Sequence, residues 1–241
     1  METASTVDVR VVRHTATADL YSLVAFLMQM PTAESVARLQ EASPAEDLQA
    51  IAGELGVEGP QVEALCARLD ALHAQLAADK NALHGVRVEH TRMFTQPHRP
   101  IVWPYEGVFM DDERLLAGME STEARVFINP AAGDAERTYQ AAGFKVDGVR
   151  EPADYIVTEL EFLAKLHVQA AKETLEGDAE AAIDTAMKLA DFKVRHANVW
   201  IPRFFTRVAE KAEHEFYLTG ADLGTFLCEV DSIEDEAPKA Q

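Results

Sequence analysis

The chain has 241 residues, of which 48% are hydrophobic and 26% are charged, so it can bury a substantial core as one large domain or two small ones. Its formal net charge of −19 argues against a general nucleic-acid binder and against docking on anionic lipid, because both need a surplus of Lys and Arg. The acidic balance favours basic partners, although the same charge also serves solubility alone.

The two cysteines, Cys66 and Cys228, lie far apart in the sequence. They form neither a disulfide framework nor the spacing of a thiolate metal site, which indicates a reducing compartment. The N-terminus lacks the pattern of a secretory signal, and no run reaches the roughly 18 apolar residues needed to cross a bilayer. We therefore expect a cytoplasmic protein without stable membrane insertion.

Helical periodicity dominates the first part of the chain. Leu20, Leu23 and Leu27 follow the spacing of one helical face, with Thr15 or Thr17 as the predicted cap. Four further helices are predicted over residues 33–42, 44–55, 60–78 and 83–94.

Residues 94–109 contain three prolines and four aromatic side chains between two long helical patterns. Proline removes a backbone donor and restricts the residue before it, so this segment is predicted to be a stiff, non-helical loop. Two interpretations stay open. The loop either presents its aromatic rings as a recognition surface or folds them back into the core.

The second half of the chain is also predicted to be helical. A short helix is expected to begin at Ser121 or Thr122 and to end at Asn129, and another, carrying Tyr139, is stopped by Gly143. Longer patterns follow over residues 152–175, 178–196, 202–218 and 221–230. The alternating run at residues 7–12 is too isolated to form a sheet. The fold class is therefore all-α, with about nine to eleven helices.

The helices are expected to pack as one unit made of two helical subdomains. The predicted boundaries are an N-terminal extension (1–14), an N-terminal helical subdomain (15–142) that includes the loop 95–109, a linker or hinge (143–151), a C-terminal helical subdomain (152–230) and an acidic tail (231–241).

Motifs of catalysis and metal binding are missing from the sequence. It has no Glu-x-x-His pair of a di-iron bundle, no His-Glu-x-x-His, no phosphate-binding glycine loop and no Gly-x-Ser-x-Gly. We therefore predict no catalytic residue, no metal ligand and no cofactor. The aromatic residues around Trp200 keep helical spacing and are assigned to the core, and so is His90. Asp154 either caps a helix or pairs with an incoming arginine.

Four motifs, taken in order, resemble the TorD/DmsD/NarJ family of redox-enzyme maturation chaperones. They lie at residues 89–94, 103–109, 151–163 and 200–202 with 216–217. The resemblance covers about residues 15–220. It implies an all-helical fold, cytoplasmic action, and binding to the twin-arginine leader and apoprotein of a molybdopterin-containing oxidoreductase before export.

The resemblance also implies which residues bind the peptide. The family's aromatic loop falls on Trp103, Pro104, Tyr105 and Glu106, and its Asp-His pair falls on Asp154 and Tyr155. Gly107 stands where a serine is usual, and Tyr155 replaces the histidine.

In this hypothesis three aromatic residues line an apolar groove, while Glu106, Asp154 and Tyr155 meet the basic region of the leader. The groove residues are Trp103, Tyr105 and Phe109. Whether the client leader is cleaved, and whether the chain is a monomer or a homodimer, stays open. An all-α metal-carboxylate enzyme and an acidic adaptor for another basic protein are the alternatives.

Overall fold

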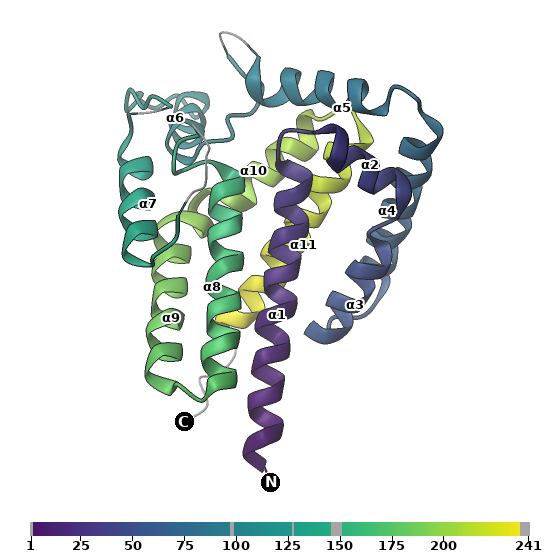
Figure 1. The fold of residues 1–241 in the computed structure, drawn as a ribbon. Helices are drawn as coiled ribbons and strands as arrows, with labels where there is room; N and C mark the ends of the chain where they lie inside the picture. The colour runs from purple at the N-terminus through teal and green to yellow at the C-terminus, as the bar shows by residue number, and fades with distance from the viewer. Residues whose placement is uncertain (1, 97–98, 127, 146–150, 237–241) are drawn as a thin grey trace.

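The computed structural model describes residues 2–96, 99–126, 128–145 and 151–236, and helices make up most of them (Figure 1). These residues contain no β-strand, only isolated bridges between Tyr105 and Tyr155 and between Arg125 and Ile128. The all-α prediction is confirmed. Its helices are α1 (Glu2–Met28), α2 (Ala33–Glu41), α3 (Ala45–Leu55), α4 (Pro60–Ala78), α5 (Ala82–His90), α6 (Glu106–Leu116), α7 (Pro130–Ala141), α8 (Ile156–Glu176), α9 (Ala179–Phe192), α10 (Asn198–Lys211) and α11 (Glu215–Glu236), with π-helical turns η1 (Thr91–Thr95) and η2 (Lys193–Ala197).

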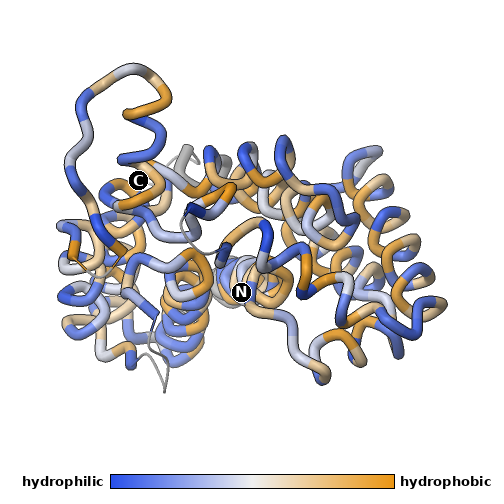
Figure 2. Tube along the Cα trace, turned by 90° about the horizontal axis from the view of Figure 1, so that it is seen from above, coloured by the Kyte–Doolittle hydropathy of each residue, from blue (hydrophilic) through white to orange (hydrophobic). Residues whose placement is uncertain are grey.

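Helix α1 lies at the centre of the molecule. It packs against α8 along much of its length and also contacts α3 and α11. Figure 2 shows α1 nearly end-on, with helices on both sides of it. Its Leu20 and Leu27 are fully buried, as the helical spacing predicted, whereas Leu23 is half-buried. The two predicted subdomains thus share α1, and their division stays a prediction.

The first helix begins much earlier than predicted, at Glu2 instead of a threonine cap. The Thr15 hydroxyl donates to the Val11 carbonyl one turn back, which is a bond made inside a helix. The predicted extension over residues 1–14 is therefore largely helical. Parts of the loop (97–98), linker (146–150) and tail (237–241) predictions lie outside the described residues.

Helix α6 was not predicted, and the helix predicted at Ser121 is not formed. Instead, the buried carboxylate of Asp111 on α6 accepts bonds from the Ser121 and Thr122 hydroxyls, at 2.7 and 2.8 Å. The hydroxyls of Ser121 and Thr122 thus bond to the preceding helix instead of starting a new one. Asn129 begins α7 by accepting a bond from the Ala132 amide at 2.8 Å. Residues 94–95 and 106–109 are helical, so the non-helical loop is shorter than predicted.

The boundary between α10 and α11 also differs from the prediction. Helix α10 directly follows the π-helical turn η2 and contains Pro202, and the helix breaks at residues 212–214. Glu89 holds this break, because its carboxylate accepts a bond from the Glu213 amide at 2.7 Å and pairs with Arg92 at 2.7 Å. Burial alone would raise the pKa of Glu89, but these bonds outweigh it and lower that pKa.

None of the described helices is both long and apolar enough to cross a membrane.

Candidate functional site

The structure brings together the two motifs that the resemblance singled out. Tyr105 and Tyr155 form an antiparallel bridge, in which the Glu106 amide donates to the Asp154 carbonyl and the Ile156 amide donates to the Pro104 carbonyl, both at 2.9 Å. Segments about fifty positions apart in the sequence are thereby joined at the start of α6 and α8. We call Trp103–Glu106 and Glu151–Tyr155, joined in this way, the motif junction.

The aromatic residues in and next to the motif junction divide into two groups. Trp103, Tyr105 and Tyr155 are half-buried, and the two tyrosine rings lie 5.6 Å apart. Phe109 is only 3% exposed and packs on Trp200, at 5.7 Å between ring centroids. Phe109 therefore folds back into the core, whereas the rings of Trp103, Tyr105 and Tyr155 stay partly accessible. Their role as a recognition surface stays a prediction.

Tyr105 is fixed by more than ring contact. Its hydroxyl donates to the Glu151 carboxylate at 2.8 Å. Burial and this acceptor raise the pKa of Tyr105, so the phenol stays protonated. Burial likewise raises the pKa of Tyr155. The accessible face of the junction therefore offers two neutral phenols and one indole, which suits an apolar chain with some hydrogen-bonding capacity.

Asp154 is a helix cap, but for α6 instead of its own helix. Its side chain accepts a bond from the Gly107 amide at 3.0 Å, and its backbone carbonyl accepts one from the Glu106 amide. Two of the unpaired donors at the start of α6 are satisfied from a distant segment. Asp154 is 0% exposed, and burial raises its pKa although the Gly107 bond opposes the rise. In this conformation the carboxyl group is not accessible to an incoming arginine.

The structure explains why glycine stands at position 107. A Cβ atom built on it would lie 2.3 Å from the Oδ1 atom of Asn129, the residue that caps α7. The starts of α6 and α7 therefore touch at this point, and a serine there would need Asn129 to move.

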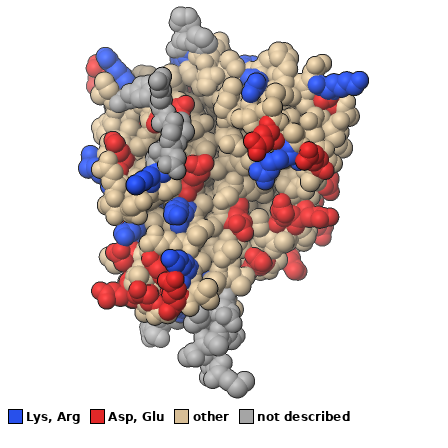
Figure 3. All heavy atoms as spheres, viewed as in Figure 1, with Lys and Arg blue, Asp and Glu red and all other residues tan. Residues whose placement is uncertain are grey.

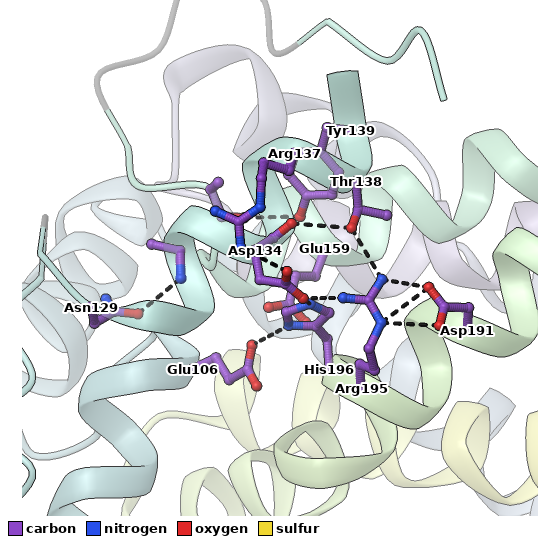
Figure 4. A network of polar contacts seen from close by, with 12 residues as sticks. Glu106, Asn129, Asp134, Arg137, Thr138, Tyr139, Glu159, Asp191, Arg195 and His196 are labelled. Carbon is purple, nitrogen blue, oxygen red and sulfur yellow. Dashed lines mark hydrogen bonds and ion pairs between the residues drawn. The ribbon is translucent and has the colours of Figure 1, made fainter. Parts of the chain in front are cut away.

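Beneath the motif junction lies a buried ionic cluster (Figure 4). The Nδ1 atom of His196 contacts the Glu106 carboxylate at 2.7 Å, and its Nε2 atom contacts that of Asp134 at 3.1 Å. Arg195 pairs with Asp134 and with Asp191 at the outer edge of the cluster. The cluster ties α6, α7 and α9–η2 together.

Glu159 completes this cluster from α8. The indole Nε1 of Trp200 donates to its Oε2 atom at 2.9 Å, whereas Oε1 has no partner in the described part of the chain. Burial, together with the neighbouring Glu106, raises the pKa of Glu159 well above its usual range. By contrast, burial would raise the pKa of Asp134, but bonds from Arg137 and His196 and the charge of Arg195 lower it.

This cluster is the arrangement that sequence reasoning missed. His196 was grouped with core residues, and Glu159 was not considered for a site. One signal was present: Glu159 lies three residues after Ile156 and four before Leu163, on the face of α8 that is buried. A carboxylate at such a position needs a partner. One ligand atom each from Glu106, Glu159 and His196 lie within 4.8 Å of one another, a set that could hold a divalent cation.

His90 is in the core, as expected, but its hydrogen bonding is incomplete. Both ring nitrogens lack a partner among the described residues, and so does the hydroxyl of neighbouring Tyr217. Burial lowers the pKa of His90 to about 4, so the ring is neutral near pH 7.

A hollow of about 1020 Å³ adjoins the motif junction. Its walls are the Tyr139 face of α7, Phe144 and the residues 151–153 that precede Asp154. The accessible phenols and this hollow make the region around α7 and the start of α8 a candidate binding site.

Comparison with known proteins identifies the family. A family model described as the nitrate reductase delta subunit matches residues 60–206, more than half of the chain. The chain belongs to the nitrate reductase delta subunit family. The match includes the motif junction and the His196 cluster, and the resemblance read from the motifs is confirmed.

Three relatives carry the name chaperone protein TorD. The protein from Vibrio parahaemolyticus is 25% identical over 174 residues, which cover 72% of this chain and 73% of that protein. The protein from Photobacterium profundum is 25% identical over 129 residues, 54% of each chain. The protein from Vibrio cholerae is 26% identical over 140 residues, 58% of this chain and 57% of its own. The chain thus spans little more than half the length of the last two.

Proposed function

We propose that this protein is a redox-enzyme maturation chaperone that binds the N-terminal leader and the apoprotein of a molybdopterin-containing oxidoreductase. Binding holds the client in the cytoplasm, assists cofactor insertion and delays twin-arginine export until the enzyme is complete. Membership in the delta-subunit family and the three relatives named chaperone support this proposal. In this role the chain itself carries out no reaction.

The accessible rings of the motif junction carry the proposal. We infer that Trp103, Tyr105 and Tyr155 contact the apolar run of the leader. Three buried residues hold these rings in position and do not contact the peptide themselves: Glu106, Asp154 and Phe109. Pro104, also buried, fixes the backbone of the junction. This revises the hypothesis that both acids meet the arginines directly.

The expected affinity follows from the size of the contact. A leader has an apolar run of about 7–15 residues, and each large side chain that it buries contributes roughly 1.5–3 kcal/mol. Ordering a flexible peptide cancels part of this gain, so we expect a dissociation constant in the micromolar range. This corresponds to a binding free energy of about −8 kcal/mol.

Trp103→Ala tests the assignment. The client precursor is first recovered by affinity purification from the producing organism, and a peptide of its N-terminal segment is titrated by calorimetry. We expect Trp103→Ala to weaken binding about tenfold or more without unfolding the protein, since the indole is only partly buried at the edge of the core. Ile183→Ala, at an exposed apolar residue on α9, is the control. Unchanged affinity of the Trp103 variant would show that the groove is elsewhere.

The buried cluster of Glu106, Glu159 and His196 favours a second candidate function, a metal-carboxylate enzyme. The residues fit a divalent cation by type, and Asp134 on the far nitrogen of His196 has the position of an outer carboxylate that orients a histidine ligand. Elemental analysis of the purified protein separates the two candidates, because stoichiometric iron or manganese would favour the enzyme. Affinity purification distinguishes the third alternative, an acidic adaptor for another basic protein, because the client recovered with an adaptor would lack any molybdoenzyme sequence.

A further inference from the structure

A second groove lies between α1, α2 and α3, with Glu161 of α8 at its edge. Its volume is about 730 Å³. The floor is apolar: Leu39 and Ile51 are buried there, and Leu23 and Phe26 on α1 are half-buried. A groove with such a floor provides contact area for apolar side chains of a peptide.

The rim of this groove is acidic. Asp19 on α1, Asp47 and Glu54 on α3 and Glu161 on α8 are all exposed, and none has an ion pair within the described ranges of the chain. Figure 3 shows acidic side chains gathered over the part of this face where α3 lies in Figure 1. Burial and the nearby Asp47 raise the pKa of Asp19, which indicates that these two carboxylates repel each other.

Among the described residues that line the groove, Arg38 is the one cation, and it is already in contact with an aromatic ring. The guanidinium of Arg38 lies over the ring of Phe26, 5.1 Å from its centroid. In the part of the chain that the structure describes, the rim therefore has an excess of negative charge: four carboxylates without an ion pair, on three helices, against one guanidinium that already contacts Phe26. The groove is complementary to a segment that carries two or more positive charges beside large apolar residues.

The client leader has this chemistry, with two arginines before an apolar run. The acids first expected to meet those arginines are buried at the motif junction, and Asp154 is committed to the α6 cap. Glu161 lies six residues after Tyr155 on α8, about 9 Å along the helix axis. We propose that the Asp19, Asp47, Glu54 and Glu161 groove binds the arginine-bearing start of the client leader. This inference rests on the proposed function.

The experiment compares two doubly neutralised variants of the full chain. Asp19→Asn with Asp47→Asn removes charge from the groove, and Glu63→Gln with Glu180→Gln removes the same charge from exposed positions on α4 and α9. The probes are the client N-terminal peptide and the same peptide with both arginines replaced by glutamine. Binding is followed by fluorescence anisotropy at low and at moderate salt.

We expect the groove variant to bind the natural peptide about fivefold more weakly at low salt and to lose most of the salt dependence. The glutamine peptide should bind both variants and the natural chain within about twofold, because the groove acids then have no partner. The control variant should retain the natural affinity within about twofold.

Each contrary outcome has a distinct meaning. If the groove variant binds normally while Trp103→Ala does not, the groove inference is overturned and the proposed function stands. If the natural chain binds no client peptide at all, the proposed function fails and the groove inference fails with it. If sedimentation shows a dimer that the groove variant dissociates, the groove is an interface between copies of this chain, which also overturns the inference.

Discussion

Asp154 offers the sharpest test of how the motif junction is built. Its carboxylate has no exposed area and accepts the Gly107 amide at 3.0 Å, so Asp154→Ala takes the acceptor away from a donor that lies at a partly buried position. A buried donor left without an acceptor costs about 1–3 kcal/mol. In a chain of this size each kcal/mol lowers the midpoint of thermal unfolding by roughly 2–4 °C, so Asp154→Ala should lower it by roughly 2–12 °C.

Two further variants serve as controls for the loss of stability predicted for Asp154→Ala. Asp154→Asn keeps the shape of the side chain and one acceptor oxygen, so we expect a loss of less than about 1 kcal/mol. Asp178→Ala removes an exposed cap of ordinary type, since Asp178 accepts the Ala181 amide at 3.1 Å at the start of α9. Its cost should be about 0.5–2 kcal/mol, less than that of Asp154→Ala. Urea unfolding followed by circular dichroism measures all three variants.

The same variants separate a structural role from a binding role. If Asp154 acts through the cap, Asp154→Asn should bind the client peptide with natural affinity and natural salt dependence. Asp154→Asn with unchanged stability but weakened, salt-insensitive binding would refute the reasoning, because it would mean that the carboxylate reaches an arginine of the peptide. An Asp154→Ala variant as stable as the natural chain would refute the cap itself.

Two further predictions concern the elements around the junction. The folded-state pKa of Glu159 is raised by burial and by Glu106, so the stability of the natural chain should fall as pH rises from about 4.3 through that raised value. Glu159→Gln lacks this fall, and its stability relative to the natural chain should increase as pH rises above about 4.3; a constant difference would contradict the assignment. Gly107→Ala should cost about 1–3 kcal/mol because its Cβ would meet Asn129, and Asn129→Ala should cost about 1 kcal/mol as a lost cap. The double variant should lose less than the sum, since the second change removes the clash, and strict additivity in urea unfolding would argue against contact.

Local pattern predicted helices well where tertiary contacts agree with it. Helix α4 occupies the predicted residues, because Pro60 opens it and its leucine stripe is buried. The prediction failed for α6, which follows a proline-rich loop and begins without a side-chain cap of its own. The missing cap is Asp154, and no local signal in residues 94–109 shows that it exists.

The candidate site divides in the same way. The motif residues Trp103, Tyr105 and Tyr155 were named from the sequence, and the structure leaves them partly accessible. The burial of Glu106 could not be anticipated, because its partner His196 lies ninety residues away. A single sequence does not show which residues meet in the fold, so it does not distinguish an acidic side chain that is free to bind a client from one that already has a partner inside the protein.

By itself the sequence determined the fold class, the positions of most helices and the family, because helical periodicity and short motifs are local properties that the chain carries whatever its surroundings. Only the tertiary structure decided which residues of those motifs reach solvent. Exposure depends on which distant segment supplies a hydrogen-bond partner, and here Asp154, Asn129 and His196 supply partners or contacts across the molecule. Because these distant partners are available, Glu106 and Asp154 lie in the interior, and the aromatic rings of the motif junction form its accessible face.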